Sequence, residues 1–528
     1  MKKLLLFVFV LMSSQIVCFA QSNNAVKYAA TITIHDLKKH LTIIASDEME
    51  GRETGTPGQH KAAAYIETQF KLLGLKAAPA LKNYQQLYPL YQDSLVKSEL
   101  SIDARTAELG KDYYCQANIS ETGTFASNKI ILVGYGIDDK NYSDYSGIDV
   151  TGKIVIFFSG EPKKDGKYLV SGTNQNSDWT YPGTDKKLAT AAAKGAAGAL
   201  VINTNQATFM TRTIEANLKS NVYYPRNTAD GKKINHAFLS HAFASTIFNT
   251  QFDAILKIAK SAQPFDQSLI FEKDISSSLK YAKNRTTINA SNVIGIIEGS
   301  DKKDEFVFLT AHYDHLGKQD GKIYYGADDD GSGTCAVIEM AEAFAKAKAA
   351  GKGPRRTMVF MTVSGEEKGL WGSEYYSDHP VFPLEKTSAD LNTDMVGRID
   401  TEREKDDTLN YVYVIGHNKL SSELQLINEG VNNQYTHLVF DYKFDDPNDQ
   451  NRIYYRSDHY NFARKGVPIL FFYDGMLQAD YHQPTDTVEK INWDLYEKRV
   501  RMIFHTAWEI ANRDEILKRD IPLGNGTR

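Results

Sequence analysis

The feature that most constrains the fold is the alternation of short apolar runs with helical stretches after about residue 285. Residues 291–299, 305–315 and 357–367 have the apolar, β-branched composition of buried strands. Between the last two, residues 332–347 place apolar side chains at i, i+3, i+4 and i+7, which is the spacing of an amphipathic helix. This alternation predicts an α/β fold, in which a mostly parallel mixed sheet is sandwiched by helices.

Further elements extend the same pattern towards both ends of the chain. Strands are expected at 391–397, 410–416 and 467–475, and a closing helix at 493–513. Near the N-terminus, residues 59–73 carry an apolar helical face, and Gly74 follows as a natural stop for that helix.

Acidic side chains and histidines gather where these strands end. In chain order they are His312, Asp314, Glu366, Glu367, Asp394 and His482. In open α/β sheets, ligands bind beyond the carboxyl ends of the strands. We therefore expect loops from one edge of the sheet to bring these side chains into one site.

Three consecutive aspartates, 328–330, precede the helix predicted at 332–347. For Asp330 the favoured interpretation is a solvated turn that caps this helix. Asp329 lies among three glycines, Gly326, Gly331 and Gly333, which indicates backbone packed closely against something. Asp329 therefore joins the candidate site residues.

Each of these residues also has an ordinary interpretation. Taken alone, His312 is more often a plain strand-end histidine, and Glu366 with Glu367 can be a solvated pair. The coincidence across five elements favours a site. Adjacent carboxylates after a buried strand face different directions, so one can bind a metal while the other handles a proton. Asp314 lies two residues after His312, on the same side of an extended chain, and can hold its imidazole.

The clustered acids need a compensating cation, because a buried carboxylate is costly without one. No block of Lys or Arg accompanies them, so a metal is expected. Histidine and carboxylate ligands together favour zinc over magnesium. One zinc takes three protein ligands and a water, so five ligands with one shared make two sets. The predicted cofactor is two Zn²⁺ ions, which can share a water nucleophile. The five predicted ligands are His312, Asp329, Glu367, Asp394 and His482.

Residues 1–20 have the organisation of a secretory signal peptide. Lys2 and Lys3 precede the apolar run 4–12, and Ala20 supplies the small residue for cleavage. The protein is therefore expected to be exported, to the periplasm or the extracellular space. The apolar run is shorter than the ~20 residues of a membrane span, and no stable membrane insertion is expected.

Residues 118–265 differ from the rest of the chain. Strand-like runs alternate there with loops rich in Gly, Asn and Lys, and the only strong helical stretch is 187–198. No histidine–acid cluster occurs in this segment. We expect a β-rich domain inserted between residues 21–117 and 266–528, which together form the main domain. The competing interpretation is one continuous domain with long loops.

Net charge limits the classes of partner that the protein can bind, and cysteine content limits the types of metal site that it can form. The formal net charge of −5 makes nucleic acid a poor candidate partner, because that partner needs a basic face. After cleavage only Cys115 and Cys335 remain, so a cysteine-rich zinc site is excluded. Cys335 falls inside a predicted helix, which favours a buried free thiol, although one disulfide stays open.

Six motifs between about 300 and 490 carry a family resemblance. They are HYDHLG, GADDDGSGT, SGEEKGLWGS, LNTDMVGR, RSDHYNF and YHQPTDT. In this order they resemble the secreted di-zinc aminopeptidase family, which includes the bacterial leucyl aminopeptidases and glutamate carboxypeptidase II. The segment GYGIDDKNYSDYSGIDVTGKIVIFFSGEP, residues 134–162, is similar to the protease-associated (PA) domain often inserted in such enzymes.

The resemblance implies a phosphorylase/hydrolase-like zinc-peptidase fold and a role for each site residue. One zinc would be held by His312, Asp329 and Asp394. The other would be held by Asp329, Glu367 and His482, so that Asp329 bridges the two. Three further residues would take part in catalysis. Glu366 would be the general base that accepts a proton from a metal-bridging water. Asp314 would orient His312, and Tyr481 would stabilise the oxyanion.

The function expected from this resemblance is an exported zinc-dependent exopeptidase that removes N-terminal residues from peptides. A carboxypeptidase of the glutamate carboxypeptidase type is also compatible with the motifs, and it needs an arginine such as Arg452 or Arg456 to hold a substrate carboxylate. A glutaminyl cyclase-like enzyme and a metal-dependent binding protein without turnover are less favoured, because the full ligand set and the presence of Glu366 indicate a hydrolase. The sequence leaves side-chain preference and oligomeric state open.

Overall fold

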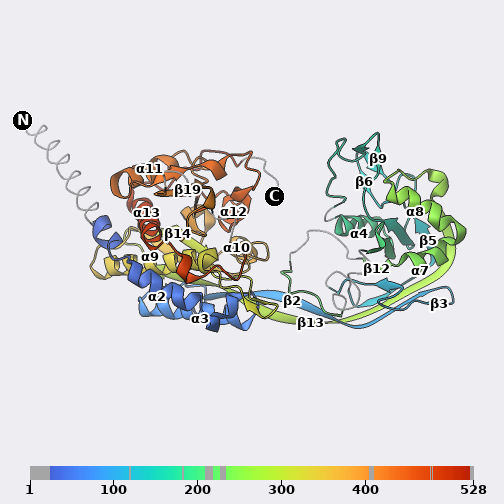
Figure 1. Ribbon diagram of the computed structural model, residues 1–528, viewed down its shortest axis with the longest axis horizontal. Helices are drawn as coiled ribbons and strands as arrows, with labels where there is room; N and C mark the ends of the chain where they lie inside the picture. The colour runs from blue at the N-terminus through green and yellow to red at the C-terminus, as the bar shows by residue number, and fades with distance from the viewer. Residues whose placement is uncertain are drawn as a thin grey trace, which may run out of the picture. The chain divides into compact units, whose positions relative to one another are not determined.

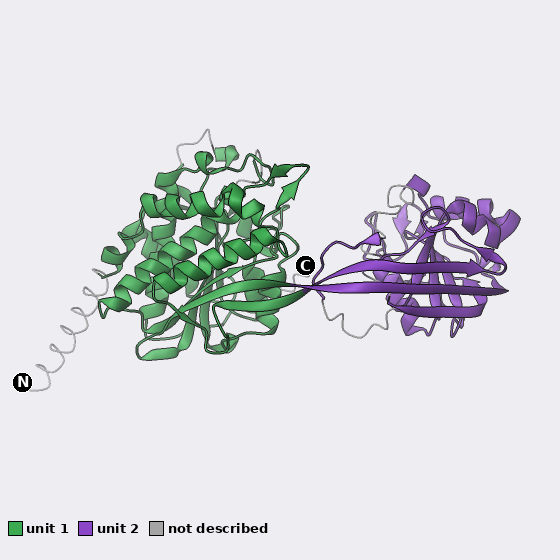
Figure 2. Ribbon diagram, turned by 90° about the horizontal axis from the view of Figure 1, so that it is seen from below, with its two compact units in different colours: residues 1–89, 289–528 green, residues 90–288 purple. Residues whose placement is uncertain are grey.

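The computed structural model describes residues 24–117, 121–180, 183–207, 218–225, 234–403, 409–475, 477 and 480–523. The predicted signal peptide, 1–20, lies outside these residues. The chain divides into two compact units (Figures 1 and 2). Unit 1 comprises residues 1–89 and 289–528, and unit 2 comprises residues 90–288.

Unit 1 is built on a mixed, mostly parallel sheet. The strand order is β20 (Val439–Asp441), β19 (Tyr411–Ile415), β21 (Ile469–Tyr473), β18 (Thr387–Thr393), β14 (Lys302–His312), β17 (Arg356–Val363) and β13 (Glu272–Ile297). Strand β14 pairs in parallel with β17 and β18, β18 pairs in parallel with β21, and β19 with β20. The pairs β13–β17 and β19–β21 are antiparallel. The predicted fold class is confirmed.

Helices cover both faces of this sheet. Along β14, Val307 and Leu309 pack towards one group of helices, whereas Phe306 and Phe308 pack towards the other, because successive strand residues face opposite sides. The first group is α2 (Ile34–Ile44), α3 (Pro57–Leu72), α9 (Gly333–Ala349), α11 (Leu424–Tyr435) and α13 (Trp493–Asn512). The second is α10 (Trp371–Asp378) and α12 (His459–Ala463). Helices predicted at 59–73, 332–347 and 493–513 therefore form, and Gly74, at φ 74°, follows α3.

Unit 2 has its own strands and core. Its strand order is β13, β5 (Gly123–Leu132), β8 (Ile154–Phe158), β11 (Gly198–Ile202), β12 (His236–Leu239) and β4 (Tyr113–Tyr114). The helix predicted at 187–198 corresponds to α4 (Thr184–Ala193). The prediction that this is the only strong helix was wrong, because α7 (His241–Phe248) and α8 (Phe252–Lys260) are also present. Each spans about two turns, too few for a clear 3.6-residue repeat in the sequence.

Unit 2 is wider than the predicted insertion, 118–265. Strand β2 (Gln85–Ile102) enters it and β13 leaves it, and the two strands are paired. Both strands are long, with 18 and 26 residues, so the unit boundary falls inside them rather than in a loop.

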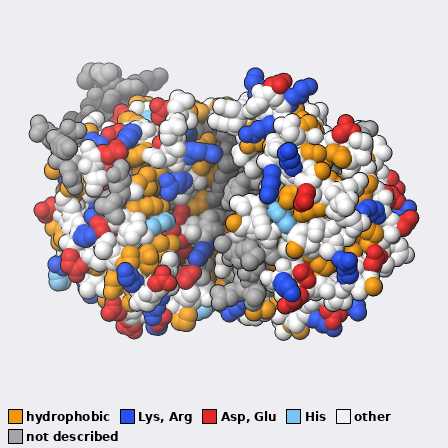
Figure 3. Space-filling view, turned by 45° about the vertical axis from the view of Figure 1, so that its right-hand side comes forward, with side chains coloured by type: hydrophobic (Ala, Val, Ile, Leu, Met, Phe, Trp, Pro, Cys, Tyr) orange, Lys and Arg blue, Asp and Glu red, His pale blue; other side chains and the backbone are white. Residues whose placement is uncertain are grey.

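Further expectations from the sequence concern the thiols, the membrane and the surface. Cys115 and Cys335 are both buried and free, which confirms the free-thiol interpretation of Cys335. Within the described ranges, every helix is too short or too polar to cross a bilayer. Basic and acidic side chains are interspersed on the face shown in Figure 3, in keeping with the small net charge.

Candidate metal centre

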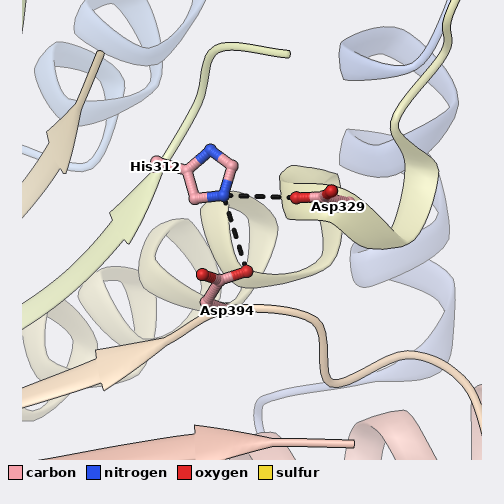
Figure 4. A group of neighbouring side chains, drawn as sticks. All are labelled: His312, Asp329 and Asp394. Carbon is pink, nitrogen blue, oxygen red and sulfur yellow. Dashed lines mark ion pairs between the residues drawn. The ribbon is translucent and has the colours of Figure 1, made fainter. Parts of the chain in front are cut away.

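The first ligand group forms around His312, the last residue of β14 (Figure 4). Its Nε2 atom lies 3.3 Å from Oδ1 of Asp329 and 3.5 Å from Oδ1 of Asp394. Asp394 directly follows β18, the parallel neighbour of β14. The two strands end side by side, and this places the histidine and the carboxylate together, as predicted from the sequence. All three residues are buried.

Asp329 lies in the turn Ala327–Ser332 that leads into α9. Gly326, which starts the turn, has φ 54°, and a Cβ there would come within 2.5 Å of the His315 ring. A Cβ on Gly333 would meet the carboxylate of Asp330. The glycines therefore allow the turn to approach its neighbours closely, as the sequence indicated.

The second group forms around Glu367, in the loop after β17. Its Oε2 atom lies 3.0 Å from Nε2 of His482, which is also 3.2 Å from Oδ2 of Asp329. Its Oε1 atom lies 2.7 Å from Nδ1 of His315. Asp329 is thus shared by both groups, and all five predicted ligands come together.

His315 is a member of this centre that the sequence prediction did not include. Its side chain is fully buried, and it belongs with Asp329 and Glu367 to a group able to hold a metal ion. The available signal was its place in HYDHLG, three residues after His312.

Asp314 contacts His312, as predicted, but mainly through its main chain. Nδ1 of His312 lies 3.1 Å from the carbonyl oxygen of Asp314 and 3.6 Å from its carboxylate. The carboxylate instead accepts hydrogen bonds from the Thr54 hydroxyl, at 2.7 Å, and from the Glu366 N–H, at 3.2 Å. Asp314 therefore also joins the loop after β17 to the loop before α3.

The prediction that Asp330 lies in a solvated turn was wrong, because its side chain is buried. One oxygen accepts from the Gly333 N–H, at 2.8 Å, at the start of α9, and from the Met395 N–H, at 3.1 Å. The second oxygen accepts from the His312 N–H, at 3.1 Å. Asp330 caps the helix and also ties together the three chain segments that carry the first group.

Glu366 and Tyr481 open onto one small cavity beside the metal groups. Oε2 of Glu366 lies 3.9 Å from Nε2 of His312. The Tyr481 hydroxyl accepts a hydrogen bond from Arg456, at 3.1 Å, and its ring stacks on His482 at 3.9 Å. The cavity is lined by polar and apolar side chains: Asp329, Glu366, Asp394, Met395, Ile453, Arg456, Ser457, Phe471, Tyr473, Leu477 and Tyr481.

The adjacent carboxyl groups after β17 differ in their electrostatic surroundings. Burial raises the pKa of Glu366 and the carboxylates of Glu367 and Asp394 add to this, so that pKa stands well above its usual range despite nearby His312. Glu367 is buried too, but contacts with His315 and His482 leave its pKa lowered. Burial would lower the pKa of His482, yet its carboxylate partners raise it to about 10.

The ligand atoms fit a bound cation. Five buried atoms of these ligand residues have no hydrogen bond of suitable geometry among the described residues: Nε2 of His312, both ring nitrogens of His315, Oδ2 of Asp329 and Oε1 of Glu367. The ligand atoms of His312, Asp329 and Asp394 lie within 4.8 Å of one another, and so do those of His315, Asp329 and Glu367. Nitrogen and carboxylate oxygen donors in sets of three are the ligands that zinc takes in hydrolytic sites.

Arg52, in the turn-rich segment before α3, supports the centre in a way that the sequence did not reveal. Its guanidinium is fully buried. It donates hydrogen bonds of 2.7–2.8 Å to the carbonyl oxygens of Ile44, Tyr313, Tyr325 and Gly326. These partners flank the chain segments that bear His312 and Asp329, so Arg52 joins both segments to the N-terminal helices.

The family model of peptidase family M28 matches residues 292–507, which contain every residue of both groups. These residues are therefore similar to peptidase family M28, and we call them the M28 domain. A PA domain model matches residues 114–247, inside unit 2. The resemblance inferred from the six motifs is therefore confirmed for the M28 domain and for the inserted PA domain.

Curated relatives of this chain include proteins described as aminopeptidases and one described as a probable glutamate carboxypeptidase. Aminopeptidase YwaD of Bacillus subtilis is 28% identical over 256 residues, covering 47% of this chain and 50% of that protein. A "probable leucine aminopeptidase" of Trichophyton verrucosum is 29% identical over 226 residues, covering 42% and 57%. A "probable glutamate carboxypeptidase" of Arabidopsis thaliana is 33% identical over 118 residues, covering 22% and 16%. The chain thus spans about half the length of the first two.

A solved structure shares the fold of the whole chain. The aminopeptidase from Aneurinibacillus sp. strain AM-1 aligns over 94% of this chain and 98% of its own, with a TM-score of 0.51 and 18% sequence identity. At this identity the likeness shows the fold alone.

Proposed function

We propose that the M28 domain is an exported zinc-dependent aminopeptidase that hydrolyses N-terminal residues from peptides. The observation that carries this proposal is the pair of ligand groups that share Asp329 beside the cavity lined by Glu366. Two of the relatives named above are described as aminopeptidases, which supports the same activity.

Two zinc ions would divide the ligands between them. His312, Asp329 and Asp394 would hold one ion, and Asp329, Glu367 and His482 the other, with His315 beside Glu367. Bound zinc supplies Lewis-acid polarisation of the peptide carbonyl and activation of water. The remaining chemistry falls to residues of the chain.

Glu366 is the proposed general base. It opens onto the cavity and belongs to neither ligand group, so its carboxylate is available to carry a proton. It would take a proton from the attacking water and return it to the leaving amine. Tyr481 would donate a hydrogen bond to the substrate oxygen. Arg456 donates to the Tyr481 oxygen, and among the described residues the hydroxyl donates to no acceptor, so its hydrogen can serve this purpose.

A carboxypeptidase is the second candidate, because Arg456 lines the same cavity and a guanidinium can hold a terminal carboxylate in two hydrogen bonds. A substrate screen separates the two activities. Aminoacyl chromogenic substrates should be hydrolysed, and N-blocked peptides with free C-termini should not. The reverse pattern would replace the proposal with a carboxypeptidase, and activity on neither would refute both.

Metal content is the companion measurement. The purified protein should carry close to two zinc ions per chain, and Asp329→Ala should lose both, because Asp329 belongs to each group. One ion or none at saturating zinc would refute the two-metal proposal.

Export is proposed from residues 1–20, and sequencing the N-terminus of the mature protein should find Gln21 first.

A further inference from the structure

We propose that Asp486 is a positioning residue that fixes the backbone of the shared ligand Asp329. This inference rests on the proposed metal site and extends it to a residue that binds no metal in either group. Asp486 lies four residues after His482, on the loop 480–486. Its position suggests that one loop both supplies a ligand and aligns another.

Asp486 accepts hydrogen bonds from consecutive backbone N–H groups of the turn before α9. The main-chain oxygen of Asp486 accepts from the Ala327 N–H at 3.2 Å. Oδ2 of its carboxylate accepts from the Asp328 N–H at 3.0 Å and from the Asp329 N–H at 3.1 Å. Three successive amides of the turn are thus bound by one residue. Holding both N–H groups that flank Asp328 fixes the peptide plane from which the Asp329 side chain projects.

These hydrogen bonds are buried and charge-assisted. Asp486 is 1% exposed, and a carboxylate accepting from backbone amides makes stronger bonds than a neutral acceptor. Its ion-pair partner is Arg398, whose Nη1 lies 4.0 Å from Oδ1 of Asp486.

The consequence is that Asp486 should influence both ions, although only the second group contains a ligand from its loop. A residue that merely stabilised the loop would act on the ion held by His482. A residue that positions Asp329 acts on both, since Asp329 is common to the two groups. Loss of a partner that orients a metal ligand typically costs about 10- to 100-fold in metal affinity.

The test is a zinc titration of the metal-free full-length protein against a chromophoric chelator, which reports the affinity of each ion without reference to activity. Asp486→Ala should weaken both ions by about 10- to 100-fold. Asp486→Asn keeps an oxygen that can accept from the same amides and should recover most of that loss. The matched control is Asp480→Ala on the same loop, whose carboxylate pairs with Arg398 and Lys490 and does not bind the turn.

Several outcomes would overturn the assignment. They are unchanged affinity in a folded Asp486→Ala protein, weakening of one ion only, no recovery in Asp486→Asn, or equal weakening of both ions by Asp480→Ala. If the wild-type protein itself binds no zinc, the proposed function fails instead. Should Asp486→Ala not fold, hydrogen exchange in the metal-free wild-type protein decides: slow exchange of the Asp328 and Asp329 amides is expected, and fast exchange contradicts the inference.

Discussion

Glu366 and Glu367 are neighbours in the sequence with different surroundings in the folded chain. Glu367 lies between His315 and His482, at 2.7 and 3.0 Å. Glu366 faces the cavity, with its backbone N–H bound to Asp314. The backbone after β17 therefore separates a carboxylate suited to binding a metal from one suited to carrying a proton.

Glu366→Gln keeps the shape of the side chain and removes the proton acceptor. We expect normal zinc content, near-normal substrate binding and a turnover number lower by at least about 100-fold, since general acid–base catalysis contributes about 10²–10⁴-fold. Steady-state kinetics with an aminoacyl chromogenic substrate, together with elemental analysis, measure these quantities.

Glu367→Gln is the matched control for this substitution and should lower zinc occupancy. The opposite pattern in the two variants would exchange the roles assigned to them. Full activity in Glu366→Gln would show that the proposed proton transfer is wrong.

His315→Ala tests the residue that sequence reasoning missed. Because His315 is fully buried against Glu367, its loss should weaken the ion in the second group by about 10- to 100-fold and leave the first group nearly unchanged. The same zinc titration checks this. His379→Ala, which removes an exposed histidine outside both groups, should have no effect. Equal zinc binding in His315→Ala and His379→Ala would exclude His315 from the centre.

For individual residues, the sequence could identify which side chains are able to bind a metal, but not which of them are buried. His312, Asp394 and His482 were predictable because each follows an apolar strand, and strand ends meet at one edge of the sheet. His315 and Asp330 were not, since one sits three residues past a strand and the other in a turn. Whether such side chains point inwards depends on tertiary contacts, here with Glu367 and with the Gly333 and Met395 amides.

Among the elements, β2 and β13 are held together by a buried ion cluster in unit 2. Asp93 of β2 accepts hydrogen bonds from Lys283, at 2.8 Å, and from Arg285, at 2.8 and 3.1 Å, both on β13. Burial opposes the charge on Asp93, but these cations outweigh it and lower its pKa to about 2. The cluster lies on the two strands that bound the insertion.

Asp93→Ala should destabilise unit 2 by about 3 kcal/mol at neutral pH, because the buried Lys283 ammonium loses its 2.8 Å carboxylate partner and keeps only the Ala117 carbonyl oxygen, at 2.9 Å, and the Glu121 carboxylate, at 3.9 Å. The folded pKa of Asp93 lies below its unfolded value. Its contribution is therefore present above about pH 4 and is lost as the pH falls towards 2. Hydrogen exchange of unit 2 peptides should show a difference between wild type and variant that shrinks over this range. A difference independent of pH would contradict the assignment.

The elements that the sequence predicted best are those whose hydrophobic repeat is long or whose strands are wholly apolar. Strands β14 and β17 and helices α9 and α13 belong to this class. The long strands β2 and β13 escaped prediction where they pass through stretches with many polar residues, such as 272–289. The predicted edges of the insertion, 118 and 265, consequently fell inside unit 2.

For the whole molecule, every ligand of both groups lies in unit 1. Replacing residues 90–288 with a short Gly-containing turn should therefore leave a protein that still binds two zinc ions. The join is feasible because β2 and β13 are paired, and the Ile294 N–H donates to the Tyr84 carbonyl oxygen at 2.7 Å. Elemental analysis and circular dichroism measure metal content and folding. A folded variant without zinc would show that unit 2 contributes to the centre.

The contacts of Arg52 determine how late in synthesis the site can form. Its carbonyl partner Gly326 is 274 residues further along the chain. At a synthesis rate of about 5–20 residues per second, Arg52 emerges roughly 14–55 seconds before that partner exists. For most of this interval Ile44 is the one of its four carbonyl partners that has been synthesised, and the site that it will brace cannot form. A nascent chain of this protein therefore cannot bring both ligand groups together until most of its length has left the ribosome.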